Sequence, residues 1–297
     1  LAAYSTDASI YKVEPMAVIL VENEHDIKKT LILANEFNVP VTARGGGTST
    51  CGQSIGKGLI LDMTRFNKIL KIDKNKKEVV VEPGIIYSKL NKQLAKDKLF
   101  FAPNPSSGDV CQIGANIANN SSGSNGLKYG VTKDHVKELE IYMPNGKKLV
   151  AKRYKIASAE YRTLARGFPF IDEIVHLLRN NQKTIEINAP KTEKHTCGYD
   201  LYSMMLDIRK NEIDLTKLFT GSEGTLGITS KATLNILKKP TKTAAMVVCF
   251  DNMSECIKAV LELKQHKPSG LEIMDRLAIE IIRTAYPKFD LPQCEVI

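Results

Sequence analysis

The amino-acid sequence predicts an α+β fold with a second domain that begins near its C-terminal end. Three observations predict it: apolar runs of strand length alternate with segments of helical periodicity, glycine-rich stretches separate them, and the pattern restarts after residue 240. The chain has 297 residues, of which 43% are hydrophobic and 25% are charged. This composition is that of a folded protein and not of a disordered one.

Residues 1–151 predict short strands and two helices. Residues 24–38 carry apolar side chains at helical spacing, and residues 85–97 do the same after a Pro-Gly break. An Asn-Gly dipeptide before residue 147 is typical of a hairpin turn. The predicted strands are residues 16–21, 39–43, 59–62, 69–72, 79–82, 136–143 and 147–151.

The rest of the chain divides into three parts. Residues 153–217 are polar with helical periodicity and predict a helical insertion, and the alternating stretch after Gly227 predicts a strand. Beyond Pro240 the pattern predicts a strand, a helix, a strand and a helix in turn. These elements are residues 244–250, 254–266, 271–274 and 276–285. We expect one domain over residues 1–240 and a truncated second domain over residues 241–297.

Composition excludes several classes of protein. The six cysteines form no CxxC pair, which argues against a zinc scaffold or a disulfide scaffold and favours the cytoplasm. The net charge of +9 is spread along the chain among acidic residues, so we expect no nucleic-acid partner. No apolar run approaches the roughly 20 residues of a membrane span, and no signal peptide is expected. The basic surface leaves a peripheral contact with a membrane or an acidic partner open.

The stretch ARGGGTSTCGQS, residues 43–54, is typical of a phosphate-binding loop. A Walker loop would need lysine where Gln53 stands, which argues against nucleoside triphosphate hydrolysis. A doubly wound dinucleotide fold would need a helix after the glycines, whereas residues 59–62 predict a strand. The two interpretations that remain are a nest of backbone amides for a pyrophosphate and a plain surface turn.

Two further segments favour the ligand interpretation. Residues 102–130 are crowded with Gly, Ser and Asn and predict an ordered loop structure, and residues 218–229 are again punctuated by glycine before a strand. Backbone and amide groups in such segments can hydrogen-bond a polar, planar ligand. Three such segments in one domain predict one extended ligand that is bound from several sides.

The chain resembles a known family in these segments. PVTARGGGTSTCGQS, VVVEPG, LFFAPNPSSGDVCQIGANIANNSSGSNGLKYGVTKDHV and LFTGSEGTLGITSKATL occur in the family's order over about residues 10–240. They resemble the FAD-binding domain of the vanillyl-alcohol-oxidase (PCMH) type, in the branch of glycolate oxidase and D-lactate dehydrogenase flavoproteins. The opening YSTDASIY is similar to long members in which an iron–sulfur region follows the flavin domain.

The resemblance implies FAD bound between two subdomains, about residues 1–72 and 73–240, with a cap domain that begins at about residue 241. Residues 44–49 would surround the pyrophosphate. Residues 102–130, the middle segment of the three, would line the adenine-to-flavin track. The implied cofactor-binding residues are Arg44, Gly45, Gly46, Gly47, Thr48, Ser49, Pro105, Ser106, Gly114, Asn116, Asn119, Ser122, Gly123, Tyr129, Gly130, Glu223, Gly224 and Ile228.

The resemblance also implies how the flavin is attached. Some relatives link it to a histidine just after the glycines, and here that position is Thr48. Relatives with a cysteinyl link place the cysteine four residues before a glycine, whereas Cys111 stands three before Gly114. We therefore expect non-covalent FAD and a packing or contact role for Cys111.

The implied reaction is oxidation of a 2-hydroxy acid of the D-lactate, glycolate or D-2-hydroxyglutarate class to the 2-oxo acid. Electrons would pass to a separate acceptor: an iron–sulfur domain or protein, a quinone or a cytochrome. The five histidines show no metal-binding spacing. We assign no metal and no catalytic residue to this chain and expect it to bind FAD without turning over alone. Two alternatives stay open: a non-catalytic flavin- or ligand-binding module, and an NADPH-dependent reductase of the same fold.

Overall fold

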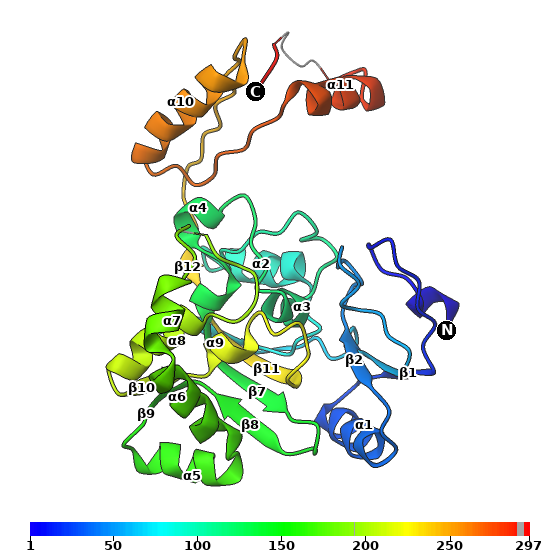
Figure 1. Cartoon of the computed structure of the whole chain (residues 1–297). Helices are drawn as coiled ribbons and strands as arrows, with labels where there is room; N and C mark the ends of the chain where they lie inside the picture. The colour runs from blue at the N-terminus through cyan, green and yellow to red at the C-terminus, as the bar shows by residue number, and fades with distance from the viewer. Residues whose placement is uncertain (193, 290–293) are drawn as a thin grey trace.

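The computed structural model describes residues 1–192, 194–289 and 294–297. Strands and helices are mixed along the chain, as Figure 1 shows, and the predicted α+β class is confirmed. Two sheets form the body of the molecule: a three-stranded parallel sheet from the N-terminal part and a five-stranded antiparallel sheet.

The N-terminal sheet has the strand order β1-β3-β2. Its elements are β1 (Ala17–Leu20), α1 (Glu24–Glu36), β2 (Val41–Arg44) and β3 (Leu59–Asp62). Asn23 begins α1 with a capping box that includes Asp26, and the helix buries Ile27 and Leu31 against the sheet. Since β2 and β3 run parallel, the chain must return along the sheet between them. The glycine-rich residues 45–58 make that return, and Arg44 is the last residue of β2.

The five-stranded sheet has the order β4-β5-β11-β7-β8. Its strands are β4 (Ile69–Asp73), β5 (Glu78–Val81), β7 (Val136–Tyr142), β8 (Lys148–Ala151) and β11 (Ile228–Asn235). Alternate residues of the central strand β11 are buried, as expected for a sheet with one face in the core. The helix α2 (Tyr87–Ala95) adds Leu90 and Leu94 to the same core.

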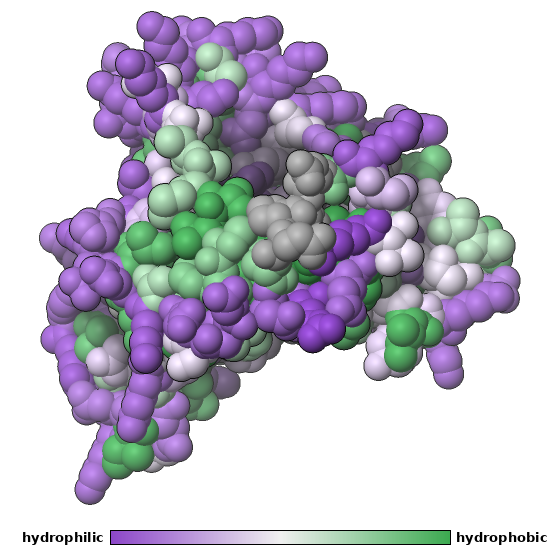
Figure 2. Space-filling view, turned by 90° about the horizontal axis from the view of Figure 1, so that it is seen from above, coloured by the Kyte–Doolittle hydropathy of each residue, from purple (hydrophilic) through white to green (hydrophobic). Residues whose placement is uncertain are grey.

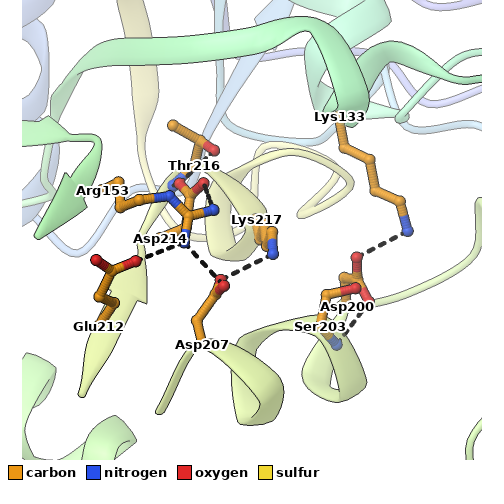
Figure 3. A network of polar contacts seen from close by, with 9 residues as sticks. All are labelled: Lys133, Arg153, Asp200, Ser203, Asp207, Glu212, Asp214, Thr216 and Lys217. Carbon is orange, nitrogen blue, oxygen red and sulfur yellow. Dashed lines mark hydrogen bonds and ion pairs between the residues drawn. The ribbon is translucent and has the colours of Figure 1, made fainter. Parts of the chain in front are cut away.

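The insertion at residues 153–217 differs from the prediction at both ends. It contains α5 (Ala159–Gly167), α6 (Phe170–Asn180), α7 (Gln182–Ile187) and α8 (Leu201–Arg209). However, it begins with β9 (Arg153–Lys155), which pairs antiparallel with β10 (Glu212–Asp214). Figure 3 shows the cause: the Arg153 guanidinium contacts Glu212, Asp214 and Asp207, at 3.2, 3.1 and 2.8 Å. These ion pairs hold the two ends of the insertion together.

The middle segment has more regular structure than the sequence predicts. It forms α3 (Ile113–Ala118) and α4 (Gly126–Tyr129), and a 3-10 turn at Thr132–His135 follows it. Three short elements were also not predicted: β6 (Leu99–Phe100), β12 (Leu237–Lys238) and α9 (Thr216–Phe219). Strand β12 pairs with β6, so the end of the main domain lies beside the middle segment.

The C-terminal segment contains the two predicted helices, α10 (Met253–Gln265) and α11 (Arg276–Ala285), which Figure 1 shows apart from the body. The strands predicted at residues 244–250 and 271–274 are wrong. Among the described residues, only the last residue of each run, Phe250 and Met274, makes backbone hydrogen bonds with the C-terminal residues, and neither run pairs along its length. An apolar run without a pairing partner leaves its backbone groups to water. Val247 of the first run is exposed, as is Leu261 on α10, and Figure 2 shows apolar areas between polar ones at this end.

Candidate functional site

The three glycine-punctuated segments lie together: the glycine loop and residues 218–229 both pack on the middle segment. The backbone amides of Gly221 and Glu223 donate to the carbonyls of Ile117 and Ala118, at 2.9 and 2.8 Å, and so hold residues 218–229 on α3. Ion pairing fixes the start of that segment, because Lys217 lies 2.8 Å from Asp207 (Figure 3).

The glycine loop packs on the other side of the middle segment. A Cβ added to Gly45 would lie 2.6 Å from Oε1 of Gln112, and one added to Gly46 would lie 2.5 Å from the carbonyl oxygen of Val110. Gly114 is equally close to Pro83, since its Cβ would lie 2.6 Å from that ring. These approaches require glycine and bring all three segments to one place.

A cleft opens where the segments meet. Its volume is about 90 Å³, and a second, mostly apolar cleft of about 400 Å³ shares the lining residues Gly224, Gly227 and Ile228 with it. Ten of the predicted site residues line the first cleft: Arg44, Gly45, Gly47, Thr48, Ser49, Gly114, Asn119, Glu223, Gly224 and Ile228.

A separate open groove of about 1210 Å³ runs beside α2 and the turn that follows α3. Four predicted residues line it: Pro105, Ser106, Ser122 and Gly123. Asn119 in the cleft and Ser121 in the groove are two residues apart, so the cleft and the groove share the middle segment. Gly123 lies against the backbone here, because its Cβ would overlap the carbonyl of Asn104.

Four predicted residues line neither space: Gly46, Asn116, Tyr129 and Gly130. Tyr129 packs edge-on against Phe100 with ring centroids 5.4 Å apart, and its carbonyl contacts Nε2 of the buried His135 at 2.7 Å. Gly130 adopts a φ of 77°, where its Cβ would meet Asp134. These residues shape the middle segment.

The cleft carries the features of an anion site. Within the part of the chain that the structure describes, the backbone amides of residues 45–49 donate to no protein acceptor. The guanidinium of Arg44 donates to the carbonyls of Thr6 and Ser54, at 2.9 and 3.2 Å, and pairs with no described carboxylate. Its positive charge is therefore not neutralised by any described carboxylate, and backbone amides without a protein acceptor beside such a guanidinium suit a phosphate.

Several buried polar atoms near the cleft have no partner among the described residues. They are Oε1 of Gln112, Oδ1 of Asn119 and Nδ2 of Asn116, while Gln112 and Asn119 themselves line the cleft. A buried polar group without a hydrogen bond costs roughly 1–3 kcal/mol, so such groups indicate a missing partner. Amide oxygens and nitrogens match the donors and acceptors of a flavin nucleotide, and the residues present fit FAD.

The sequence-based list missed part of the cleft lining: Ala43, Gln53, Ser54, Met63, Pro83, Gln112, Ala115, Ala118, Phe219, Ser222, Gly227 and Thr229. Gln53, Gln112 and Ser222 lie inside the quoted motifs, so their position among the glycines was a usable signal. Pro83 also had such a signal, because it belongs to the motif VVVEPG. Met63 follows strand β3 and reaches the cleft only through the sheet topology, for which the sequence offers no local signal.

Cys111 is buried in the main core, with 1% of its surface exposed. Burial raises the pKa of its thiol, although the neighbouring side chains of Ser107 and Asn116 act in the opposite direction. A buried thiol with a raised pKa is a poor nucleophile. This environment suits a packing residue.

Comparison with known proteins identifies the domain. Residues 15–152 match the family described as "FAD binding domain". The chain is 31% identical over 294 residues to the glycolate oxidase subunit GlcD of Bacillus subtilis. The aligned residues cover 97% of this chain and 52% of the relative. It is also 32% identical over 279 residues to the D-2-hydroxyglutarate dehydrogenase of Pseudomonas putida, and this alignment covers 91% of this chain and 27% of the relative.

The chain thus spans about half of the length of the glycolate oxidase subunit and about a quarter of the length of the D-2-hydroxyglutarate dehydrogenase. A solved structure of an alkyldihydroxyacetonephosphate synthase shares the fold, with a TM-score of 0.60 and 20% identity over 89% of this chain and 40% of that one. None of the helices in residues 1–192, 194–289 and 294–297 combines the length and apolar character that a membrane span needs.

Proposed function

This chain belongs to the family of flavoproteins with a PCMH-type FAD-binding domain, and on that premise we propose that it is the FAD-binding part of a 2-hydroxy-acid oxidoreductase. The whole enzyme would oxidise a substrate of the D-lactate, glycolate or D-2-hydroxyglutarate class to the 2-oxo acid. Two relatives named for glycolate and D-2-hydroxyglutarate support this substrate class.

One observation carries the assignment of the cofactor site. A loop whose backbone amides have no acceptor among the described residues and the Arg44 guanidinium, which pairs with no described carboxylate, line the same cleft as the unpartnered amide oxygens of Gln112 and Asn119. We assign the pyrophosphate to Arg44 and residues 45–49. The adjoining apolar cleft, lined by Leu31, Pro40 and Ile228 among others, suits an adenine ring. The open groove along the middle segment suits the flavin end.

Bound FAD would supply the acceptor for the hydride equivalent that leaves the α-carbon of the hydroxy acid. The residues of this chain would bind and orient it. Arg44 would offset the charge of the pyrophosphate, and Gln112 and Asn119 would gain hydrogen-bond partners. We propose a non-covalent link, since Thr48 offers no ring nitrogen and the thiol of Cys111 is buried in the core.

We further propose that the FAD-binding domain ends near Pro240 and that residues 241–297 begin a substrate or cap domain. Every residue that lines the cleft assigned to the pyrophosphate precedes residue 230, and in the groove assigned to the flavin end only Lys239 and Glu272 follow it. Electrons would leave to a separate acceptor, an iron–sulfur centre, a quinone or a cytochrome. We propose a cytoplasmic protein whose basic surface allows peripheral contact with a membrane or an acidic partner.

The test uses the full-length protein with an artificial electron-accepting dye and a panel of D-lactate, glycolate and D-2-hydroxyglutarate. We expect dye reduction with at least one of these acids, and 2-oxo acid formed in equal amount. Failure of all three acids, together with oxidation of added NADPH, would favour a reductase and overturn the proposal.

A further inference from the structure

The last residues of the chain return to the start of the C-terminal segment. The amide of Phe250 donates to the carbonyl of Val296 at 2.9 Å, and the amide of Val296 donates back at 3.2 Å. Ile297 exchanges a similar pair of hydrogen bonds with Met274, at 2.8 and 2.9 Å. Four backbone hydrogen bonds therefore hold the C-terminal residues beside residue 250.

This return brings two cysteines together. Cys249 directly precedes Phe250, and Cys294 lies two residues before Val296. The Cys294 thiol has the Cys249 side chain as a hydrogen-bonding neighbour, and neither cysteine is in a disulfide. Cys249 is exposed and Cys294 is half-buried, so one thiol of the pair is open to solvent and the other is partly protected.

The remaining cysteines of the chain have other surroundings. Cys111 and Cys256 are buried, with 1% and 2% of their surface exposed, and are closed to a dissolved oxidant. Cys51 is exposed on the glycine loop, and Cys197 is exposed within the helical insertion, between α7 and α8. They offer matched positions for control variants.

We propose that Cys249 and Cys294 form a redox-active dithiol, which a small-molecule disulfide such as glutathione disulfide oxidises reversibly to an intrachain disulfide. The exposed Cys249 thiolate attacks one sulfur of glutathione disulfide, and one glutathione leaves. The Cys294 thiolate then attacks the Cys249 sulfur and displaces the second glutathione. Two protein thiols lose two electrons, glutathione disulfide gains them, and the two thiol protons end on the two glutathione molecules.

The order of the two steps follows from the surroundings. Desolvation and the hydrogen bond with Cys249 raise the pKa of the Cys294 thiol, while Arg283 acts in the opposite direction. A smaller fraction of Cys294 is therefore in the thiolate form. This suits Cys294 to the second step, because its target, the Cys249 sulfur, is already close to it within the protein.

The disulfide would close a loop that contains α10 and α11. This loop reaches the open groove, because Glu272 lines the groove and a Cβ on Gly270 would lie 2.3 Å from the carbonyl oxygen of Ser124. Oxidation would thus restrain the segment that borders the flavin side of the domain.

The test begins with the 297-residue chain equilibrated with glutathione and glutathione disulfide, quenched with a thiol-blocking reagent. Digestion with trypsin and a protease that cuts before aspartate separates Cys249 from Cys256 at Asp251. We expect a linked peptide that joins Cys249 to Cys294 and is lost on reduction. Cys249→Ser should abolish it, and Cys197→Ser should leave its yield unchanged.

Hydrogen exchange provides a second measurement on the same samples. Oxidation should slow exchange at the Phe250 and Val296 amides at least about tenfold, since a cross-link restrains local opening. Cys249→Ser should show no slowing. Glutathione attached singly to Cys249, a link between Cys249 and any cysteine other than Cys294, or unchanged exchange in the linked protein would each overturn the proposal.

Discussion

Gly45 lies so close to Gln112 that a Cβ on the glycine would be 2.6 Å from the Oε1 atom of the glutamine side chain. Gly45 follows β2 of the N-terminal sheet, and Gln112 immediately precedes α3. The contact therefore joins the phosphate-binding loop to the middle segment at the cleft itself. It makes the shape of the cleft sensitive to a single methyl group.

Gly45→Ala should weaken FAD binding more than it weakens the fold. The added methyl must displace the Gln112 side chain, which lines the cleft and would move into it. We expect the dissociation constant for FAD to rise by about tenfold or more, which is about 1.4 kcal/mol. Titration with FAD, followed by flavin fluorescence, measures it.

Two further variants make this test specific. Gly45→Ala combined with Gln112→Ala should recover part of the affinity, because the obstructing side chain is gone. Gly167→Ala is the control, since no atom lies within 4 Å of its Cβ position. Equal affinity in Gly45→Ala and the unaltered chain would contradict the assignment of this cleft.

Arg44→Gln should lower the affinity for FAD and should also make that affinity less dependent on salt. The guanidinium charge is not neutralised by a described carboxylate, and charge-assisted bonds to phosphate are about twice as strong as neutral ones. We expect at least about a tenfold rise in the dissociation constant at low salt and a smaller effect of added salt than in the unaltered chain. Arg65→Gln, at an exposed pair with Glu22, should change neither quantity.

Asp200→Asn should destabilise the protein at neutral pH. Asp200 is 8% exposed, caps α8 through the Ser203 amide and lies 2.9 Å from Lys133. Asparagine preserves the cap but leaves the lysine without its carboxylate, which should lower the free energy of unfolding by about 1–3 kcal/mol. Urea unfolding at pH 7 measures this loss. Glu186→Gln, at an exposed pair with Arg209, should have no measurable effect.

The same pair has a defined pH dependence. Burial raises the pKa of Asp200, but the hydrogen bond and charge of Lys133 outweigh it, and the net pKa is lowered. The stabilisation is therefore complete above about pH 4, the unfolded pKa, and is lost as pH falls through the lower folded pKa. The difference between Asp200→Asn and the unaltered chain should shrink below pH 4. A constant difference from pH 7 to pH 3 would contradict this account.

Residues 1–240 alone should bind FAD with nearly the affinity of the 297-residue chain, within about threefold. The cofactor cleft is lined only by residues that precede residue 230, whereas the C-terminal segment reaches the groove through Glu272. Parallel titrations of the two chains with FAD measure the difference. Loss of binding in the shorter chain would show that the domain boundary lies elsewhere.

The elements that the sequence predicted well have signals within the element itself. The helix α1 carries its own capping box at Asn23 and its own apolar stripe. The strand β11 shows alternating burial in agreement with its alternating sequence. Where local propensity and tertiary packing agree, the sequence is sufficient.

The elements that it missed depend on distant partners. The helix α3 is short and contains Gly and Asn, and it is held by Gly221 and Glu223 from a segment a hundred residues away. Strand β9 needs β10 across the insertion. The apolar run at residues 244–250 has strand composition but no strand beside it. In the site, the motifs predicted the glycines, while Met63 lies outside every motif and reaches the cleft through sheet topology.

The measurement that tests the central claim most directly is an absorbance spectrum of the purified 297-residue chain from 300 to 550 nm, after saturation with FAD and removal of free cofactor. Acid precipitation follows, and the supernatant is measured. We predict flavin bands at one FAD per chain that move entirely into the supernatant, as a non-covalent cofactor would. A folded chain that retains no flavin, or flavin that stays in the precipitate, would contradict this account.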